Sequence, residues 1–418
     1  MKVLGLITEY NPFHNGHLYH LRQSKALSGA DYTLCVMSGN FIQRGEPALI
    51  NKWARARMAL EAGVDAVIEL PTVYAMASAE FFAHGAVSIL EKTGIVDFIC
   101  FGSEHGRIEV LDSIAKVLVD EPESYKAALR LQLSKGISFP AARELAVKDY
   151  FKSHGDPELH TEEVMGSSNN ILGIEYLKAI RKLESRIIPL TIRRVGSTYN
   201  SAEFTGGMSS ATSIRKHLQG EPLQTSRTAL SGVLPAPSLS ILSEELQNGR
   251  GPVFPADFEN ILLAGLRKAS PEELQLLPDV SEGLENRIKE AACQSGTLSE
   301  LVDNIATKRY PRTRVQRILF NSMLGVTSDE TDRFNRHGGP QYIRVLGFNK
   351  KGRELLSQMN RKASLPVVVK TADFKNSCNP LLKRMLELES LATDLYVLGC
   401  KNPAFRKAGQ EFTQNVLF

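Results

Sequence analysis

NPFHNGHLYHL, residues 11–21, follows a short apolar run at 3–8 and opens a predicted helix. His14 and His17 stand three residues apart, a spacing that places both imidazoles on one face of a first helical turn. That turn carries unpaired N–H groups and the positive end of the helix dipole, so it attracts phosphate. Gly16 has no Cβ, which lets a ligand approach the backbone. The stretch predicts a strand, a phosphate-binding loop and a helix, although a loop with two surface histidines is the alternative interpretation.

The rest of the first 200 residues alternates apolar, strand-like runs with helical patterns. The predicted strands are 3–8, 32–37, 65–70, 96–101 and 187–192, and the predicted helices are 17–28, 51–62, 76–92 and 104–118. Continuous apolar runs of this kind are typical of strands that are buried on both faces. The pattern predicts an α/β fold with a Rossmann-like parallel sheet, in which ligands bind beyond the carboxyl ends of the strands.

A length of 418 residues indicates at least two domains. We expect an α/β domain at 1–225, with a helical insertion at about 120–165, and a mostly helical, basic domain at 226–418. Pro, Ser and Gly are frequent at 221–256, so the boundary is expected there. Short helices are expected over 257–330, and a strand–helix–strand unit after them. The Gly-rich loop 196–207 is expected to move over a site.

Composition bounds the class of protein. Hydrophobic residues make up 43% and charged residues 23% of the chain, as in ordinary globular proteins. No apolar run is long enough for a membrane span and no secretory signal is evident, so we expect a cytoplasmic protein. The five cysteines are scattered, which argues against a disulfide framework and a structural zinc site. Cys35 and Cys100 lie in strand-like runs and are expected to be buried.

The net charge of +4 is small, but basic residues are concentrated in one window. Residues 305–362 hold 13 basic residues against 4 acidic ones. Arginines at 309, 312, 314 and 317 alternate with Tyr310 and Phe320, and the excess continues through Arg333, Arg336, Lys350, Lys351, Arg353, Arg361 and Lys362. Arginine and aromatic side chains suit phosphate contact and base stacking, so the window predicts RNA binding. A solvated helical face is the alternative.

The loop SGNFIQRGEPALINKWARARM, 38–58, is a second cationic segment. It carries Arg44, Lys52, Arg55 and Arg57, and it follows a predicted strand. Such a loop lies near the ligand of an α/β sheet, where it is expected to hold a small acid or the RNA. Trp53 is expected to be a core residue rather than a base-stacking one.

A third motif is SSATSIRKHL, 209–218. Ser209 or Ser210 is expected to cap a helix that carries Arg215 after its first turn. By itself this is a capped amphipathic helix. Together with the histidine loop, it supplies hydroxyls, N–H groups and a guanidinium that suit the β- and γ-phosphates of a nucleotide. The two motifs fit attack on an α-phosphate with pyrophosphate as the leaving group.

These motifs resemble those of the nucleotidylyltransferase superfamily. More closely, the stretches GLITEYNPFHNGHLYHL, VMSGNFIQRGEPALINKWARARMAL, FGSE, SSNNILGIEYLKAI and SSATSIR are similar to bacterial tRNA(Met) cytidine acetate ligases. The similarity runs along the whole chain and is most specific in residues 1–105. It implies that ATP and acetate form acetyl-adenylate, which then yields N4-acetylcytidine at the wobble position of elongator tRNA(Met), without acetyl-coenzyme A.

The resemblance also implies that 1–225 is an ATP-binding, nucleotidylyltransferase-like catalytic domain and that 226–418 binds tRNA. It further implies which residues form the site. His14 and His17 are the expected catalytic residues. The expected ATP-binding residues are Ile7, Thr8, Glu9, Tyr10, Asn11, Pro12, Phe13, His14, Asn15, Gly16, His17, Leu18, Tyr19, His20, Gly102, Asn169, Arg194, Ser210 and Arg215. Pattern alone leaves other roles open: a turn glycine at Gly102, a helix N-cap at Asn169, surface charge at Arg194 and simple packing at His20.

Mg²⁺ is expected to bridge the phosphates, but no carboxylate cluster for it is evident, and Glu9 and Glu104 are only weak candidates. The expected partners are elongator tRNA(Met) and acetate, with no membrane and no obligate protein partner. Two other functions fit the same motifs. One is a small-molecule adenylyltransferase, which the basic window disfavours. The other is a non-catalytic RNA-binding protein that keeps ATP as a structural ligand.

Overall fold

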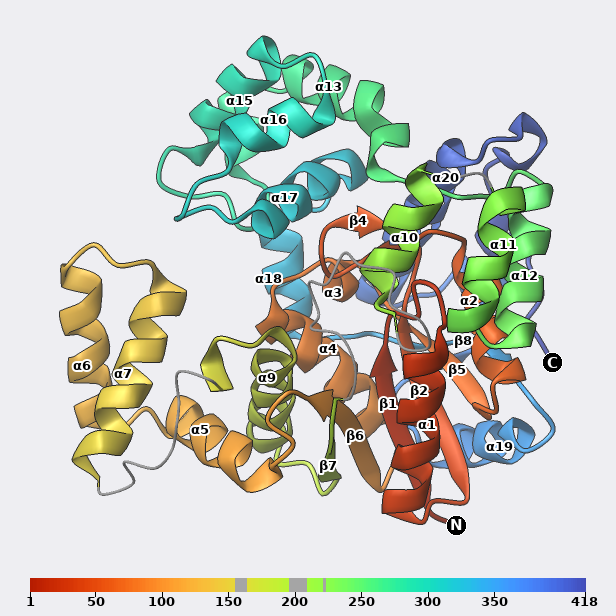
Figure 1. The fold of residues 1–418 in the computed structure, drawn as a ribbon, viewed down its shortest axis with the longest axis horizontal. Helices are drawn as coiled ribbons and strands as arrows, with labels where there is room; N and C mark the ends of the chain where they lie inside the picture. The colour runs from red at the N-terminus through yellow and green to blue at the C-terminus, as the bar shows by residue number, and fades with distance from the viewer. Residues whose placement is uncertain (155–163, 195–208, 221–222) are drawn as a thin grey trace.

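The computed structural model describes residues 1–154, 164–194, 209–220 and 223–418, and its centre is a mostly parallel sheet (Figure 1). Seven strands in the described residues form this sheet, in the order β7-β6-β1-β2-β5-β8-β9. Their bounds are β1 Val3–Thr8, β2 Tyr32–Ser38, β5 Ala66–Leu70, β6 Phe98–Ser103, β7 Ile188–Arg193, β8 Ile343–Phe348 and β9 Val367–Val368. All five strands predicted from the sequence are present, so the predicted α/β class is confirmed.

Alternate residues of each strand lie in two different hydrophobic cores, one on each face of the sheet. Leu34 and Val36 of β2 pack on one face, against α4 (Ala79–Lys92), α5 (Ile108–Asp120) and α9 (Ser168–Lys182). Cys35 and Met37 pack on the other, against α1 (Asn15–Ser28), α2 (Lys52–Glu61) and α12 (Ala236–Gln247). Burial on both faces is the physical reason for the continuous apolar runs. Cys35 and Cys100 are buried, as expected.

Helical groups surround the sheet. The insertion consists of α6 (Glu123–Ser134) and α7 (Phe139–Ser153), which project away from the sheet (Figure 1). A second group is gathered at the opposite end of α10 (Ala211–Gly220) from the sheet (Figure 1). It contains α13 Glu259–Lys268, α14 Pro271–Gln275, α15 Leu284–Gln294, α16 Leu298–Ile305 and α17 Arg312–Leu324, and α18 Ser328–Arg336 leads from it back toward α4 (Figure 1). None of the helices in the described residues has the length and apolar character needed to cross a bilayer.

The segment 221–256 is more ordered than its composition predicts. The structure places α11 (Leu223–Val233) and α12 there, and α12 packs on α2. Leu242 and Ile241 of α12 are buried in the second core. The apolar residues of the segment therefore outweigh its Pro, Ser and Gly content. The loop 196–207, expected to cover a site, lies outside the described residues.

The predicted strand–helix–strand unit is confirmed as β8, α19 (Gly352–Lys362) and β9, but the sequence did not indicate where it packs. β8 runs antiparallel to β5 and parallel to β9, so this late segment extends the sheet that the first 200 residues began. α20 (Pro380–Tyr396) and α21 (Gln410–Thr413) follow it. The sheet contains strands from both 1–225 and 226–418. The division of the chain into domains at this position remains a prediction.

Candidate active site

A cavity of about 230 Å³ opens at the carboxyl ends of β1, β6 and β7. The first turn of α1, the start of α9 and the start of α10 close its other sides. In a parallel sheet this is the edge where the loops after several strands meet. The two motifs that stand almost 200 residues apart in the sequence, around His14 and Ser210, therefore lie in one pocket.

His14 and His17 form the entry to α1. His14 is the N-cap residue, and its Nδ1 accepts a hydrogen bond from the backbone N–H of Gly16 at 3.1 Å. His17 Nδ1 accepts from the backbone N–H of His14 at 3.3 Å, and the two rings stack with centroids 3.7 Å apart. Because each Nδ1 is an acceptor, the neutral rings carry their proton on Nε2 and are hydrogen-bond donors there.

This arrangement gives a second reason for the glycine in the loop. The N–H of Gly16, expected to be open for phosphate, already donates to His14 Nδ1. A Cβ at Gly16 would lie only 2.9 Å from Cε1 of His14, so the imidazole also favours glycine there. Gly16 lines the cavity, and its contact with a ligand remains a prediction.

The electrostatics of the pocket keep these histidines neutral. Burial lowers the pKa of His14 to about 3, and the charges of Arg194 and Arg215 act in the same direction. Burial, with His14 and Arg194, lowers the pKa of His17 well below its ordinary value. Burial and Arg194 lower the pKa of His20 to about 4. At neutral pH the positive charge of the site therefore comes from arginine, not from imidazolium.

We expect the substitution His14→Asn to flatten the acid side of the stability profile. The pKa of His14 is lower in the folded chain than in the unfolded chain, so its contribution is complete above about pH 6.5 and is lost as the pH falls below that value. Between about pH 7 and pH 5 the loss is about 2 kcal/mol. Asn is itself a favourable N-cap.

Urea unfolding of both proteins at the two pH values measures this difference. The exposed His337 provides the matched substitution, His337→Asn, which should leave the wild-type profile unchanged. An unchanged acid slope in His14→Asn would show that His14 is not buried as a neutral group.

Cations dominate the remainder of the pocket. Arg44, Arg193, Arg194 and Arg215 line it, and Glu9 is the one acidic residue among the described lining residues. Arg215 donates from Nη1 to the carbonyl of Asn11 at 3.0 Å, which fixes the start of α10 against the histidine loop. Ser210 Oγ accepts from the backbone N–H of Ser213 at 3.1 Å, so the predicted cap of this helix is Ser210. The net positive pocket suits a polyanion such as a triphosphate.

Glu104 and Asn169 join the loop after β6 to α9. Glu104 accepts hydrogen bonds from the backbone N–H groups of Asn169 and Asn170, at 3.3 and 2.9 Å, and from Asn169 Nδ2 at 2.6 Å. The N-cap of α9 is Ser167, so the alternative of an N-cap at Asn169 is wrong. Both Glu104 oxygens accept hydrogen bonds from the start of α9, and Glu104 is not among the residues that line the cavity.

Most residues expected to bind ATP line the cavity. They are Ile7, Thr8, Glu9, Tyr10, Asn11, His14, Gly16, His17, Tyr19, His20, Gly102, Asn169, Arg194, Ser210 and Arg215. Pro12, Phe13, Asn15 and Leu18 are not among the lining residues. Phe13 is a core residue against Tyr10, and Asn15 Nδ2 donates to the carbonyl of Gly232 at 3.0 Å. Alternate residues of a tight loop point to opposite sides, so a continuous motif cannot place all its side chains on one ligand.

Other lining residues were not among the predicted ATP-binding set. They are Gln43, Arg44, Phe82, Phe101, Leu172, Tyr176, Ile192, Arg193, Ala211 and Thr212. Asn169, Leu172 and Tyr176 are three and seven residues apart, so one helix face of α9 could have been inferred from Asn169. No comparable signal in the sequence points to Phe82, which reaches the pocket from α4 through tertiary packing.

Three polar atoms of the lining residues are buried without a hydrogen-bond partner in the described part of the chain. They are Tyr10 Oη, Asn11 Nδ2 and His20 Nε2. Asn11 Oδ1 accepts from the backbone N–H of Leu49 at 2.7 Å, which fixes the orientation of the amide. Buried donors of this kind normally bond to something, so they mark positions where a ligand oxygen or a water fits.

The cationic loop 38–58 is only partly at the site. Gln43 and Arg44 line the pocket, and the backbone N–H of Gln43 donates to Glu9 Oε1 at 2.9 Å. Arg55 is fully buried and donates to the carbonyls of Glu9, Ser38, Gly39 and Ile50. It fastens the loop to β1 and is not available to a ligand. Trp53 is buried, as predicted.

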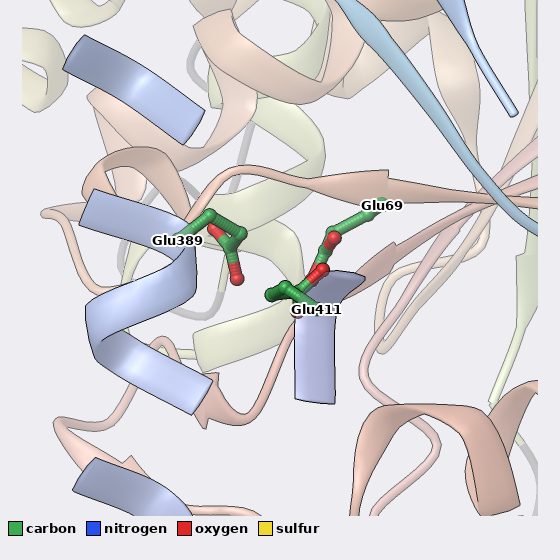
Figure 2. Close-up of side chains that lie close together, drawn as sticks. All are labelled: Glu69, Glu389 and Glu411. Atoms are coloured by element: carbon green, nitrogen blue, oxygen red, sulfur yellow. The ribbon is translucent and has the colours of Figure 1, made fainter. Parts of the chain in front are cut away.

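Lys52 is also buried inside the protein, where it is paired with carboxylates. Figure 2 shows Glu69, Glu389 and Glu411 converging from β5, α20 and α21. Among the described residues these carboxylates are close enough together to hold a metal ion. Lys52 Nζ lies 2.6 Å from Glu69 Oε1 and 3.4 Å from Glu389 Oε1, and it also contacts Glu411. An ammonium already fills the centre, so the group is a buried ion cluster and the expected ligand role of Lys52 is wrong.

The basic window is divided between two places. Near α17, Arg309 and Arg312 pair with Glu282 and Asp303, and Arg317 lies 3.6 Å from Asp279. The residues around α19 lie at the amino ends of the strands, because Lys351 Nζ contacts the carbonyl of Asp31, just before β2. This is the edge of the sheet opposite to the pocket (Figure 1). The basic residues of this window therefore do not form one continuous surface for RNA.

The paired imidazoles and guanidinium groups at the end of β1 define a nucleotidyl transferase site, and comparison with known proteins agrees. A family model described as HIGH Nucleotidyl Transferase matches residues 1–411. The tRNA(Met) cytidine acetate ligase of Acetivibrio thermocellus is 59% identical over 417 residues, covering 100% of both chains. That of Alkaliphilus metalliredigens is 45% identical, covering 98% of this chain and 97% of its own. The chain belongs to the tRNA(Met) cytidine acetate ligase family.

Solved structures agree over the whole chain. Crystal structures of Thermotoga maritima TmcAL are similar with TM-scores of 0.92 for a form bound with alpha-thio ATP and 0.95 for an apo form. Each is 39% identical and covers 100% of this chain and 99% of its own. The recognition made from the motifs is therefore confirmed.

Proposed function

We propose that the protein is an ATP-dependent ligase that transfers acetate to the wobble cytidine of elongator tRNA(Met), forming N4-acetylcytidine through acetyl-adenylate. The observation that carries this proposal is the pocket itself. Two neutral imidazoles and four guanidinium groups meet at the carboxyl end of β1, in a chain of this family. A relative of known structure binds an ATP analogue.

In the first step an acetate oxygen attacks the α-phosphorus of ATP, the bond to the bridging oxygen breaks, and pyrophosphate leaves. Negative charge grows on the leaving group, and the side chains of Arg215, Arg194, His14 and His17, which line the pocket, would stabilise it. These groups are held by Asn11 and by the cap of α1 before substrate arrives, so little reorganisation is needed.

In the second step the exocyclic amine of cytidine attacks the acetyl carbonyl. A carbon–nitrogen bond forms, the bond to the AMP phosphate breaks, and the amine loses a proton. Both Nδ1 atoms already accept hydrogen bonds and burial lowers the pKa of His14 and His17, so the proton would pass to the departing phosphate or to water rather than to these rings. Because acetyl-adenylate already carries the driving force, no cysteine or serine nucleophile is needed.

We propose that acetate lies beside Asn11 and His20, whose buried donor and ring nitrogen have no partner in the described chain. Mg²⁺ would be held mainly by the phosphates of ATP, since Glu9 is the one carboxylate among the described lining residues. Burial raises the pKa of Glu9, and its Oε1 already accepts from Gln43. We therefore expect chelation of Mg²⁺ to abolish turnover without unfolding the protein.

Exchange of labelled pyrophosphate into ATP tests the first step. We expect exchange that depends on acetate and on no phosphorylated metabolite. Mass spectrometry of nucleosides from tRNA incubated with ATP and acetate tests the second, and acetyl-coenzyme A should fail as the donor. Exchange that depends on a phosphorylated metabolite would identify a small-molecule adenylyltransferase, and the absence of any product would indicate a binding protein.

A further inference from the structure

A second groove adjoins the nucleotide pocket and has no role in the proposed ATP chemistry. It lies between α10 and the helices α13, α16 and α17, and its volume is about 430 Å³. Thr212 and Arg215 line both the groove and the nucleotide pocket. One face of α10, at Thr212, Arg215, Lys216 and Gln219, forms its wall, a spacing of three, four and seven residues along the helix.

The junction between the two cavities is polar and connected. Arg215 Nη2 lies 3.7 Å from Glu46 Oε2, and Glu46 Oε1 accepts from Gln316 Nε2 at 3.4 Å. α10, the loop that carries Glu46 and α17 are thereby linked at the point where the cavities meet. A substrate in the groove would reach the pocket beside Arg215, where the proposed chemistry develops its charge.

The remaining lining groups have the chemistry of a nucleotide site. Lys216 is exposed on α10, and Arg312 is 55% exposed at the start of α17, so cations lie on both sides of the groove. Arg312 pairs with Asp303, and because this ion pair is exposed, a phosphate can exchange for the carboxylate. Phe254 offers a half-buried ring between them, and Gln219, Gln316 and Glu259 offer amide and carboxylate groups. Cations suit phosphates, a ring suits base stacking, and amide or carboxylate oxygens accept from an exocyclic amine.

From this placement we infer that the second groove binds the acceptor nucleotide of the RNA, unstacked from its neighbours, with its base amine directed at the junction beside Arg215. The inference rests on the proposed function. The C–N bond would form there, the acetyl–AMP bond would break, and AMP would leave with its electron pair while the amine proton is released. The basic residues around α19, on the opposite edge of the sheet, would not contact that nucleotide.

The test compares two doubly substituted proteins of equal charge loss. Lys216→Ala with Arg312→Ala alters the groove, and Lys350→Ala with Arg353→Ala alters the exposed surface around α19. Acetate-dependent pyrophosphate exchange reports on the nucleotide pocket without RNA. Formation of N4-acetylcytidine on tRNA reports on both steps. The wild-type exchange assay is the control for the proposed function, because its failure would refute that function whatever the variants do.

For the groove pair we expect pyrophosphate exchange like that of wild type and kcat/KM for tRNA lowered by about tenfold or more, because two phosphate contacts are lost. Each lost contact should also reduce the slope of log affinity for tRNA against log salt concentration by roughly 0.7. The α19 pair should match wild type in both assays. Phe254→Leu removes the ring while keeping an apolar side chain, and it should lower acetylation but not exchange. The inference is overturned if the groove pair acetylates tRNA normally, if both assays fall together, or if the α19 pair shows the loss instead.

Discussion

Replacing His17 with alanine lowers acetate-dependent pyrophosphate exchange by about a hundredfold or more, if the pocket works as proposed. The expected loss corresponds to about 3 kcal/mol in the barrier, the range measured when one fixed donor to a developing negative charge is removed. His17 stacks on His14 and accepts from its backbone N–H, so the substitution also loosens the ring of its neighbour. Kinetics of exchange at saturating ATP measure the effect on turnover.

Two comparisons make this result specific. His337→Ala removes an exposed imidazole at the end of α18 and should retain wild-type turnover. His14→Ala should be as inactive as His17→Ala but less stable, because His14 is also the N-cap of α1. Wild-type exchange in a folded His17→Ala protein would refute the catalytic role of this pair.

The largest effect on stability is expected for Lys52→Met. Lys52 is fully buried among the carboxylates of Glu69, Glu389 and Glu411, and these charges raise its pKa although burial opposes them. Removing one partner of a buried ion cluster leaves uncompensated charge, which costs about 3–5 kcal/mol. We expect the free energy of unfolding to fall by that amount, measured by urea denaturation with circular dichroism.

A substitution of the acidic partner Glu69 tests whether loss of the lysine charge is the cause of this destabilisation. Burial and the neighbouring Glu389 raise the pKa of Glu69 well above its ordinary value, because the cluster holds three carboxyl groups and only one lysine. Glu69→Gln keeps the shape of the cluster and leaves the ammonium of Lys52 with two carboxyl partners, so its effect should be much smaller than that of Lys52→Met. Equal destabilisation by the two substitutions would show that the ammonium does not compensate the charges as the geometry indicates.

Local sequence was sufficient for the centre of the site. The strand at 3–8, the loop that follows it and α1 are continuous in the chain, so their apolar run, glycine and histidine spacing were sufficient to predict these elements. The cap at Ser210 is local in the same sense. Alternation of buried strands and helices determined the α/β class, because burial on both faces imposes a continuous apolar run on each strand.

Tertiary structure alone decided which charged residues face a ligand and which are internal. Lys52, Arg55 and Arg44 look alike in one cationic loop, yet the first two are buried on partners as distant as Glu411, and only Arg44 lines the pocket. It also decided that β8 joins the sheet beside β5 and that α17 and α19 lie apart. The hydrophobic periodicity of a segment indicates how much of its surface is buried. It does not indicate which other segment covers that surface, because this packing depends on contacts between residues that lie hundreds of positions apart in the sequence.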